Sequence, residues 1–123
     1  MNLRTGVDLI EINRIAEAIE RHGERFLNRV YTDNEQKECN GRISSLAVRF
    51  AAKEAAAKAL GCGIGLVSWL EIEVRSDEMK APYLILSGEG ERLAKKMGLV
   101  TWSISLSHAE KMAIAFVVAI GEK

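Results

Sequence analysis

Apolar residues recur at two different periods along the chain, and the change of period predicts an α+β protein. Branched apolar runs, or apolar residues alternating with polar ones, predict β-strands at residues 6–12, 70–75, 83–86, 102–107 and 112–120. Apolar spacings of three and four residues predict helices over residues 13–31, 43–60 and 87–98. We therefore expect a single small domain, residues 1–123, in which an antiparallel sheet packs against a long central helix.

Individual residues predict where the helices begin and end. Gly23 interrupts the first helical segment, which predicts one kinked helix or two short ones. Thr32 and Glu35 have the spacing of a capping box, so a short helix should follow Thr32. Gly61 comes directly after the alanine-rich segment and suits the left-handed position that ends a helix.

The last predicted strand, residues 112–120, is apolar on both faces. Its large residues, such as Phe116, alternate with small ones, such as Ala115. Both faces should therefore be buried, although a domain of this size has only one core. We expect the face of small residues to meet either a helix or another subunit.

Composition and charge exclude several classes of protein. The 123 residues match the usual size of one domain, and 48% of them are apolar, which permits a core. Seventeen basic residues balance seventeen acidic ones, which argues against a nucleic-acid or membrane binder held by net charge. No apolar run reaches the roughly 20 residues of a membrane span. The two cysteines, Cys39 and Cys62, suggest no disulfide framework, so we expect a cytoplasmic protein.

The alanine-rich helix also carries residues that can do chemistry. Glu54 and Lys58 are four residues apart and share one face, where they can form an ordinary exposed ion pair. The surrounding alanines predict close packing, in which a carboxylate needs a partner. A Mg²⁺ ion is one such partner, because it takes one or two carboxylates together with water and substrate phosphate. Asp8 can supply a second carboxylate, or it can simply cap a turn.

Three segments resemble the holo-acyl-carrier-protein synthase family, the small bacterial type of phosphopantetheinyl transferase. They are Gly6-Val7-Asp8-Leu9-Ile10-Glu11-Ile12, then Arg49-Phe50-Ala51-Ala52-Lys53-Glu54-Ala55 with Lys58, and finally Ser105-Leu106-Ser107-His108. They occur in the family's order and at about its spacing, and the resemblance covers nearly the whole chain. One departure is Met79-Lys80-Ala81-Pro82, which lacks the glycine-lysine-proline turn common in relatives.

The resemblance implies an enzyme of fatty acid biosynthesis that transfers 4′-phosphopantetheine from coenzyme A to a serine of apo-acyl carrier protein, releasing adenosine 3′,5′-bisphosphate. It implies that Asp8 and Glu54 hold Mg²⁺ against the pyrophosphate, which Lys58 also contacts. Either Glu54 or a water bound to the metal accepts the serine proton. The other implied contacts with coenzyme A are Arg49, Lys53, Gly61, Gly63, Ser107 and His108.

The resemblance also implies a homotrimer with active sites shared between subunits. In the family, the carrier protein docks on the first helical segment, where Arg14, Arg21 and Arg25 are the candidates here. Without the resemblance, those arginines and the glutamates near them favour an ordinary solvated surface. The native carrier protein, the use of acylated coenzyme A and the choice between Mg²⁺ and Mn²⁺ stay open.

Two other classes of function are compatible with the sequence. A non-catalytic module could use the arginines of the first helix to bind an acidic partner. A different magnesium-dependent enzyme could act on a nucleotide pyrophosphate, for example by hydrolysis. The first class would show no magnesium-dependent affinity for coenzyme A, and the second would release adenosine bisphosphate without an acceptor.

Overall fold

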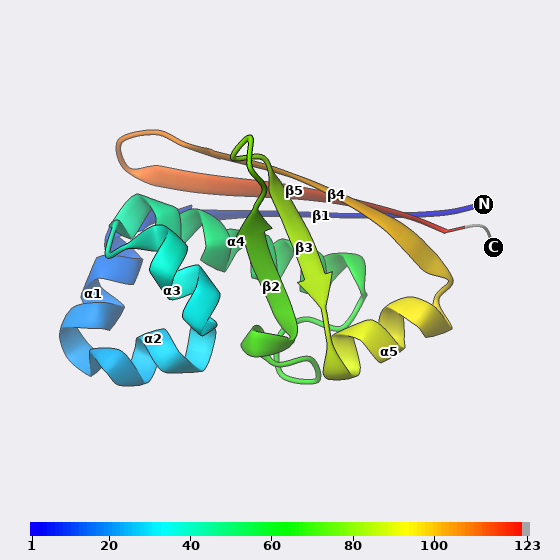
Figure 1. Cartoon of the computed structure of the whole chain (residues 1–123), viewed down its shortest axis with the longest axis horizontal. Helices are drawn as coiled ribbons and strands as arrows, with labels where there is room; N and C mark the ends of the chain where they lie inside the picture. The colour runs from blue at the N-terminus through cyan, green and yellow to red at the C-terminus, as the bar shows by residue number, and fades with distance from the viewer. Residues whose placement is uncertain (122–123) are drawn as a thin grey trace.

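The chain folds into two antiparallel sheets, with its helices on one side of the larger sheet (Figure 1). The computed structural model describes residues 1–121, and no helix in that range has both the length and the apolarity that a bilayer crossing requires. The predicted α+β class is confirmed. The elements are β1 (Asn2–Glu11), α1 (Ile12–His22), α2 (Glu24–Val30), α3 (Asp33–Cys39), α4 (Ile43–Ala59), the 3₁₀ turn η1 (Trp69–Glu71), β2 (Ile72–Ser76), β3 (Pro82–Leu86), α5 (Gly88–Lys96), β4 (Leu99–His108) and β5 (Met112–Gly121).

The larger sheet has the order β1-β5-β4, with β5 in the middle. Because side chains alternate between the faces of a strand, the small residues of β5 all point to one face. Ala115 and Val117 lie on that face with no exposed surface. In the register of β1 and β5, Gly6 pairs with Val117 and Asp8 pairs with Ala115. Gly6 and Asp8 therefore point to the same face as the small residues.

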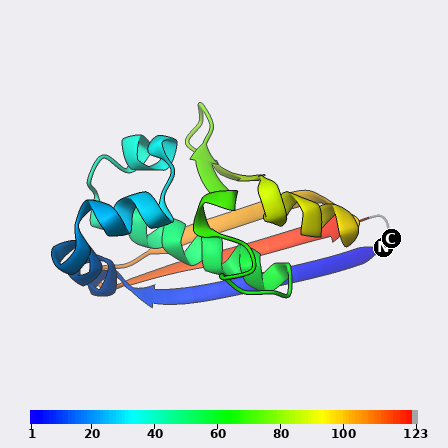
Figure 2. The same ribbon diagram turned by 90° about the horizontal axis from the view of Figure 1, so that it is seen from below.

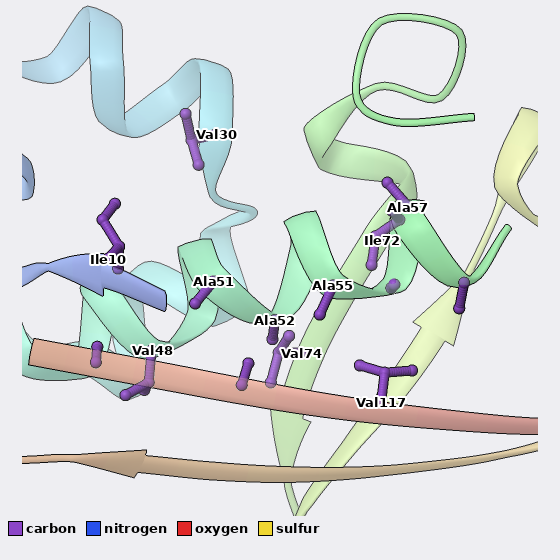
Figure 3. Packing of buried hydrophobic residues seen from close by; sticks show 14 of the residues in the cluster. Ile10, Val30, Val48, Ala51, Ala52, Ala55, Ala57, Ile72, Val74 and Val117 are labelled. Carbon is purple, nitrogen blue, oxygen red and sulfur yellow. The ribbon is translucent and has the colours of Figure 1, made fainter. Parts of the chain in front are cut away.

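Helix α4 covers this small-residue face (Figure 2). Its alanines let the helix approach the sheet closely, and Ala51, Ala52 and Ala55 are completely buried. Figure 3 shows α4 beside β5, which carries Val117, and the hairpin strand β2, which also contacts α4, contributes Ile72 to the core. Of the two expectations for the small-residue face of β5, contact with a helix is the one realised within the chain.

The opposite face of the larger sheet, here called the outer sheet face, has no helix over it in the described part of the chain, residues 1–121 (Figure 1). Three cross-strand pairs of β1 and β5 lie on it: Leu3 with Ile120, Val7 with Phe116, and Leu9 with Ile114. These six side chains are 39–60% exposed. Within residues 1–121 the face of large residues meets no other element of the chain, so its burial, expected from the sequence, stays a prediction about assembly with another subunit.

The predicted helix boundaries at Gly23, Thr32 and Gly61 are confirmed. Gly23, with φ of 56°, separates α1 from α2, and Thr32 and Glu35 form the capping box of α3. Gly61 has a φ of 77° after α4. One strand prediction is wrong at its start, because residues 69–71 form η1 and the strand begins only at Ile72. A second capping box, formed by Ser68 and Glu71, favours the 3₁₀ turn there.

Candidate active site

Asp8, Glu54 and Lys58 are brought together where β1 crosses α4. The Lys58 ammonium lies 3.2 Å from Asp8 Oδ1 and donates a hydrogen bond to the Val7 carbonyl at 3.0 Å. Glu54 is one helical turn before Lys58 and lines the same pocket as Asp8. The fold therefore places two carboxylates and one ammonium side by side, although 46 residues separate Asp8 from Glu54 in the sequence.

The surroundings of Glu54 favour its protonated form. Partial burial raises the pKa of Glu54, the charge of Asp8 raises it further, and the charge of Lys58 opposes both effects. Two like charges this close favour a shared cation or a shared proton. Lys58 offsets only part of the negative charge of Asp8 and Glu54, because the Lys58 side chain is 53% exposed and its charge is screened by water.

A pocket of about 420 Å³ opens beside these residues, between α1, α2 and α4. Its polar side is formed by Asp8, Glu54 and Arg14, and its apolar wall includes Phe26 and Phe50. The Phe50 ring lies 4.5 Å from that of Trp69, centroid to centroid, which fixes its orientation. The pocket thus combines a charged end with an apolar wall, a combination suited to a ligand that has a phosphate and a carbon chain.

The donor set at this site fits magnesium better than a transition metal. Within residues 1–121 there is no group of three or more His, Cys, Asp or Glu side chains that could hold a metal by protein ligands alone. Magnesium does not require such a cage, because it binds through one or two carboxylates and completes its shell with water and phosphate oxygens. Asp8 and Glu54 therefore fit a cation that a phosphate-bearing ligand helps to hold.

Arg49 and Lys53 lie on a different side of α4, facing β2. The Arg49 guanidinium forms a 2.6 Å ion pair with Glu38 and also lines a second pocket of about 300 Å³, together with Lys80. Lys53 is fully buried and donates to Glu35 at 2.7 Å and to the carbonyls of Trp69 and Ile72. Burial lowers the pKa of Lys53, an effect that Glu35 opposes.

The structure does not support the prediction that Lys53 contacts coenzyme A. Its three N–H donors already have three protein acceptors, and no surface of the residue is exposed. The sequence pattern placed Lys53 beside Glu54, but adjacent residues on a helix point about 100° apart. Lys53 therefore points into the core, whereas Glu54 faces the pocket.

The remaining predicted contacts are spread over two regions. Gly61 and Gly63, with φ of 77° and 70°, form the loop that follows α4, just beyond Lys58. His108 ends β4 and pairs with Ala113, so it lies on the α4 side of the sheet, whereas Ser107 pairs with Ile114 on the outer sheet face. Both side chains are exposed. A ligand on one face of the sheet can therefore meet only one of the two directly.

The three candidate arginines for a partner are exposed along α1 and α2. Arg14 lines the pocket of Asp8 and Glu54, and Arg25 lines a neighbouring hollow together with His22 and Arg29. Arg21 is exposed near the end of α1. Basic side chains therefore extend from the rim of the main pocket over the adjoining surface.

Sequence reasoning missed the aromatic wall of the pocket and the glycine beneath it. Phe50 precedes Glu54 by one helical turn, so its position on the same face was available from the spacing. Phe26 belongs to α2, and nothing in the sequence predicted that it would meet α4. Gly6 lies two residues before Asp8 on the same face of β1 and contacts the backbone of α4.

Three comparisons with known proteins agree with one another. The model of the 4′-phosphopantetheinyl transferase superfamily matches residues 4–117. The chain is 51% identical to the holo-[acyl-carrier-protein] synthase of Herpetosiphon aurantiacus, over 97% of this chain and 99% of that protein. It is 47% identical to the synthase of Halothermothrix orenii, over 92% and 93%. The crystal structure of the Helicobacter pylori synthase in complex with coenzyme A superposes with a TM-score of 0.87 at 35% identity, covering 94% of this chain and 99% of that one.

Proposed function

The chain belongs to the 4′-phosphopantetheinyl transferase superfamily, and from this premise we propose how its residues carry out the reaction. The protein is an enzyme that transfers the 4′-phosphopantetheine group from coenzyme A to a serine of apo-acyl carrier protein. The products are holo-carrier protein and adenosine 3′,5′-bisphosphate. The whole chain, residues 1–123, constitutes one transferase domain.

The observation that carries the proposed site is the convergence of Asp8, Glu54 and Lys58 at a pocket that is charged at one end and apolar along its wall. Asp8 and Glu54 hold a Mg²⁺ ion, and Lys58 places a point charge beside the pyrophosphate. When bound, the ion neutralises charge on the phosphate oxygens and on the leaving group. Positioning and charge neutralisation are the main contributions that phosphoryl transfer requires of a protein.

Glu54 also accepts the proton of the attacking serine. The serine oxygen forms a bond to the phosphorus that carries the pantetheine arm, and the bond from that phosphorus to the adenosine bisphosphate oxygen breaks. Glu54 would thus help to hold the ion and also receive the serine proton. Glu54 lines the main pocket beside Asp8, so it lies within reach of a serine presented at that pocket, which is the first requirement of a general base.

Coenzyme A has contacts beyond the metal site. Arg49 binds a phosphate on the adenosine side, through the second pocket that Lys80 also lines. Gly61 and Gly63 border the path of the pantetheine arm, where the lack of side chains lets a slender ligand approach the backbone. His108, exposed at the end of β4, contacts a phosphate. Ser107, on the outer sheet face, reaches a ligand held by an adjacent subunit.

The protein assembles as a homotrimer whose active sites are shared between subunits. The three apolar pairs on the outer sheet face support this, because exposed apolar side chains that are contiguous across strands favour burial against another surface. Within one chain, the Arg49 pocket is separate from the pocket of Asp8 and Glu54. An active site formed by two subunits would combine the Arg49 pocket of one subunit with Asp8 and Glu54 of the next. A cytoplasmic location is consistent with the free thiols of Cys39 and Cys62.

The carrier protein docks on α1 and α2 through Arg14, Arg21 and Arg25. Arg14 lines the main pocket, Arg25 lines the neighbouring hollow, and Arg21 is exposed on the same helical segment, so an acidic helix bound there would present its serine to Asp8 and Glu54. Complementary charge of this kind mainly accelerates encounter and orients the partner.

The experiment that tests the activity combines the protein with coenzyme A, apo-carrier protein and Mg²⁺ and measures the mass of the carrier. The expected result is a gain of one phosphopantetheine group, which chelation of the metal prevents. Omission of the carrier is the control. Adenosine bisphosphate formed without a carrier would point to a pyrophosphate hydrolase, and absence of both products would point to a binding module.

A further inference from the structure

Gly6 lies where β1 and α4 approach most closely. A Cβ atom built on Gly6 would overlap the carbonyl oxygen of Ala55, and it would lie 2.8 Å from the carbonyl carbon of Ala55 and 3.2 Å from the nitrogen of Ala59. These are backbone atoms of a buried helix, which cannot rotate away as a flexible side chain can. Any residue other than glycine at position 6 must therefore push β1 away from α4.

The contacts on either side of Gly6 extend the same junction. Every second residue of β1 points toward α4, and Arg4 donates a hydrogen bond from Nε to the Ala59 carbonyl at 2.9 Å. On the other side of Gly6, Lys58 reaches back to the Val7 carbonyl and to Asp8. Ala55 and Ala59 are the immediate neighbours of Glu54 and Lys58 in the sequence. The residues that Gly6 touches are thus bonded directly to the functional ones.

We propose that Gly6 is a positioning residue: its missing side chain lets β1 lie against the α4 backbone, which sets the separation of the Asp8 carboxylate from Glu54 and Lys58. The inference rests on the proposed function, because it concerns the pair of carboxylates assigned to the metal. Misplacement of a reacting group by about 1 Å can cost about 100-fold in rate. A methyl group at position 6 therefore loosens metal binding by moving one ligand away from the other.

The chain offers a matched control in Gly121. A Cβ there would overlap the carbonyl oxygen of Gly98, and it would lie 2.8 Å from the carbonyl carbon of Gly98 and 3.3 Å from the nitrogen of Leu99. Gly121 is at the end of β5 and pairs with Asn2, at the far end of β1 from Asp8. Gly121→Ala therefore imposes an equivalent backbone clash without disturbing the junction beneath the carboxylates.

The experiment measures the affinity for coenzyme A by calorimetry, with and without Mg²⁺, for the wild type, Gly6→Ala and Gly121→Ala at low temperature. Circular dichroism establishes that each variant is folded. We expect Mg²⁺ to strengthen coenzyme A binding in the wild type and in Gly121→Ala. In Gly6→Ala, the factor by which Mg²⁺ strengthens coenzyme A binding should be at least about 10-fold smaller than in the wild type. The metal-free affinity of Gly6→Ala for coenzyme A should stay near that of Gly121→Ala.

Each other outcome has a definite meaning. Equal magnesium dependence in Gly6→Ala and Gly121→Ala overturns the positioning role. If Gly6→Ala does not fold, Arg4→Met decides, because it removes the hydrogen bond to Ala59 and loosens the same junction without a clash. An undiminished magnesium effect in folded Arg4→Met overturns the proposal. If the affinity of the wild type for coenzyme A does not change with Mg²⁺, the proposed metal role itself is overturned. That result differs from one in which Mg²⁺ strengthens binding equally in all variants, which overturns only the role of Gly6.

Discussion

Replacing Lys53 by methionine should cost stability and not catalysis, contrary to the role that the sequence suggested for this residue. The Lys53 ammonium and the Glu35 carboxylate are both fully buried and lie 2.7 Å apart. Glu35 also accepts hydrogen bonds from the backbone of Thr32 and Val74, so the pair joins α3 and β2 to α4. Methionine fills a similar volume but leaves the Glu35 charge without its partner.

The expected loss is large because a buried charge is left uncompensated. Removing one partner of a buried ion pair costs about 3–5 kcal/mol. The carbonyls of Trp69 and Ile72 lose a donor as well, which favours the upper part of that range. At about 4 °C per kcal/mol for a chain of this size, the unfolding midpoint should fall by about 12–20 °C.

The assay compares Lys53→Met with Lys58→Met, the same chemical change on the same helix. Unfolding is followed in urea, and turnover is measured at low temperature, where both variants are folded. Lys58 is exposed, so its replacement should change stability by less than about 1 kcal/mol. Lys58→Met should nevertheless lose most of its turnover, whereas folded Lys53→Met should retain it.

A further variant tests the proposed cause of the instability. Adding Glu35→Gln to Lys53→Met removes the unpaired charge and keeps a carbonyl oxygen for one of the two backbone donors, Thr32 or Val74, so part of the lost stability should return. The reasoning is refuted if Lys53→Met unfolds at the wild-type urea concentration. It is equally refuted if folded Lys53→Met is inactive with a raised Michaelis constant for coenzyme A, since that would make Lys53 a ligand contact.

Three further predictions concern the carboxylates, the outer sheet face and the partner surface. Because the folded-state pKa of Glu54 is raised, ionisation of Glu54 lowers the stability of the metal-free protein as pH rises through that pKa. In calorimetric scans without metal, Glu54→Gln should therefore unfold at a higher temperature than the wild type at pH 7, and this difference should vanish below about pH 4, although the variant should be inactive. Phe116→Asp should dissociate the oligomer in sedimentation experiments and keep a native circular dichroism spectrum, and a trimeric Phe116→Asp protein would contradict the proposed interface. Ala115→Asp places a charge against α4 and should lower the free energy of unfolding by about 3 kcal/mol or more. Arg21→Glu should raise the Michaelis constant for the carrier protein several-fold at low salt and much less at 1 M salt, where the screening length is about 3 Å. An increase that is the same at both salt concentrations would exclude docking by complementary charge at this helix.

Patterns that are local in the sequence predicted local structure well. Thr32 and Glu35 cap α3 as expected, and Gly23 and Gly61 end helices at the predicted positions, because each of these signals acts within a single turn of chain. The extent of the strands was harder to predict. β1 runs from Asn2 rather than from Gly6, because its earlier residues are ordered by pairing with β5, more than 100 residues away in the sequence.

The sequence alone determined most of the secondary structure, the α+β class and, through three short segments, the family and its candidate residues. Only the tertiary structure decided which of those residues act together. Lys53 and Glu54 are neighbours in the sequence, yet the rotation of the helix directs one to Glu35 in the core and the other toward Asp8. The closeness of Asp8 to Lys58 depends on contact between β1 and α4, which the small residues Gly6 and Ala55 permit. Such proximity arises from packing between distant segments, and no spacing within one segment encodes it.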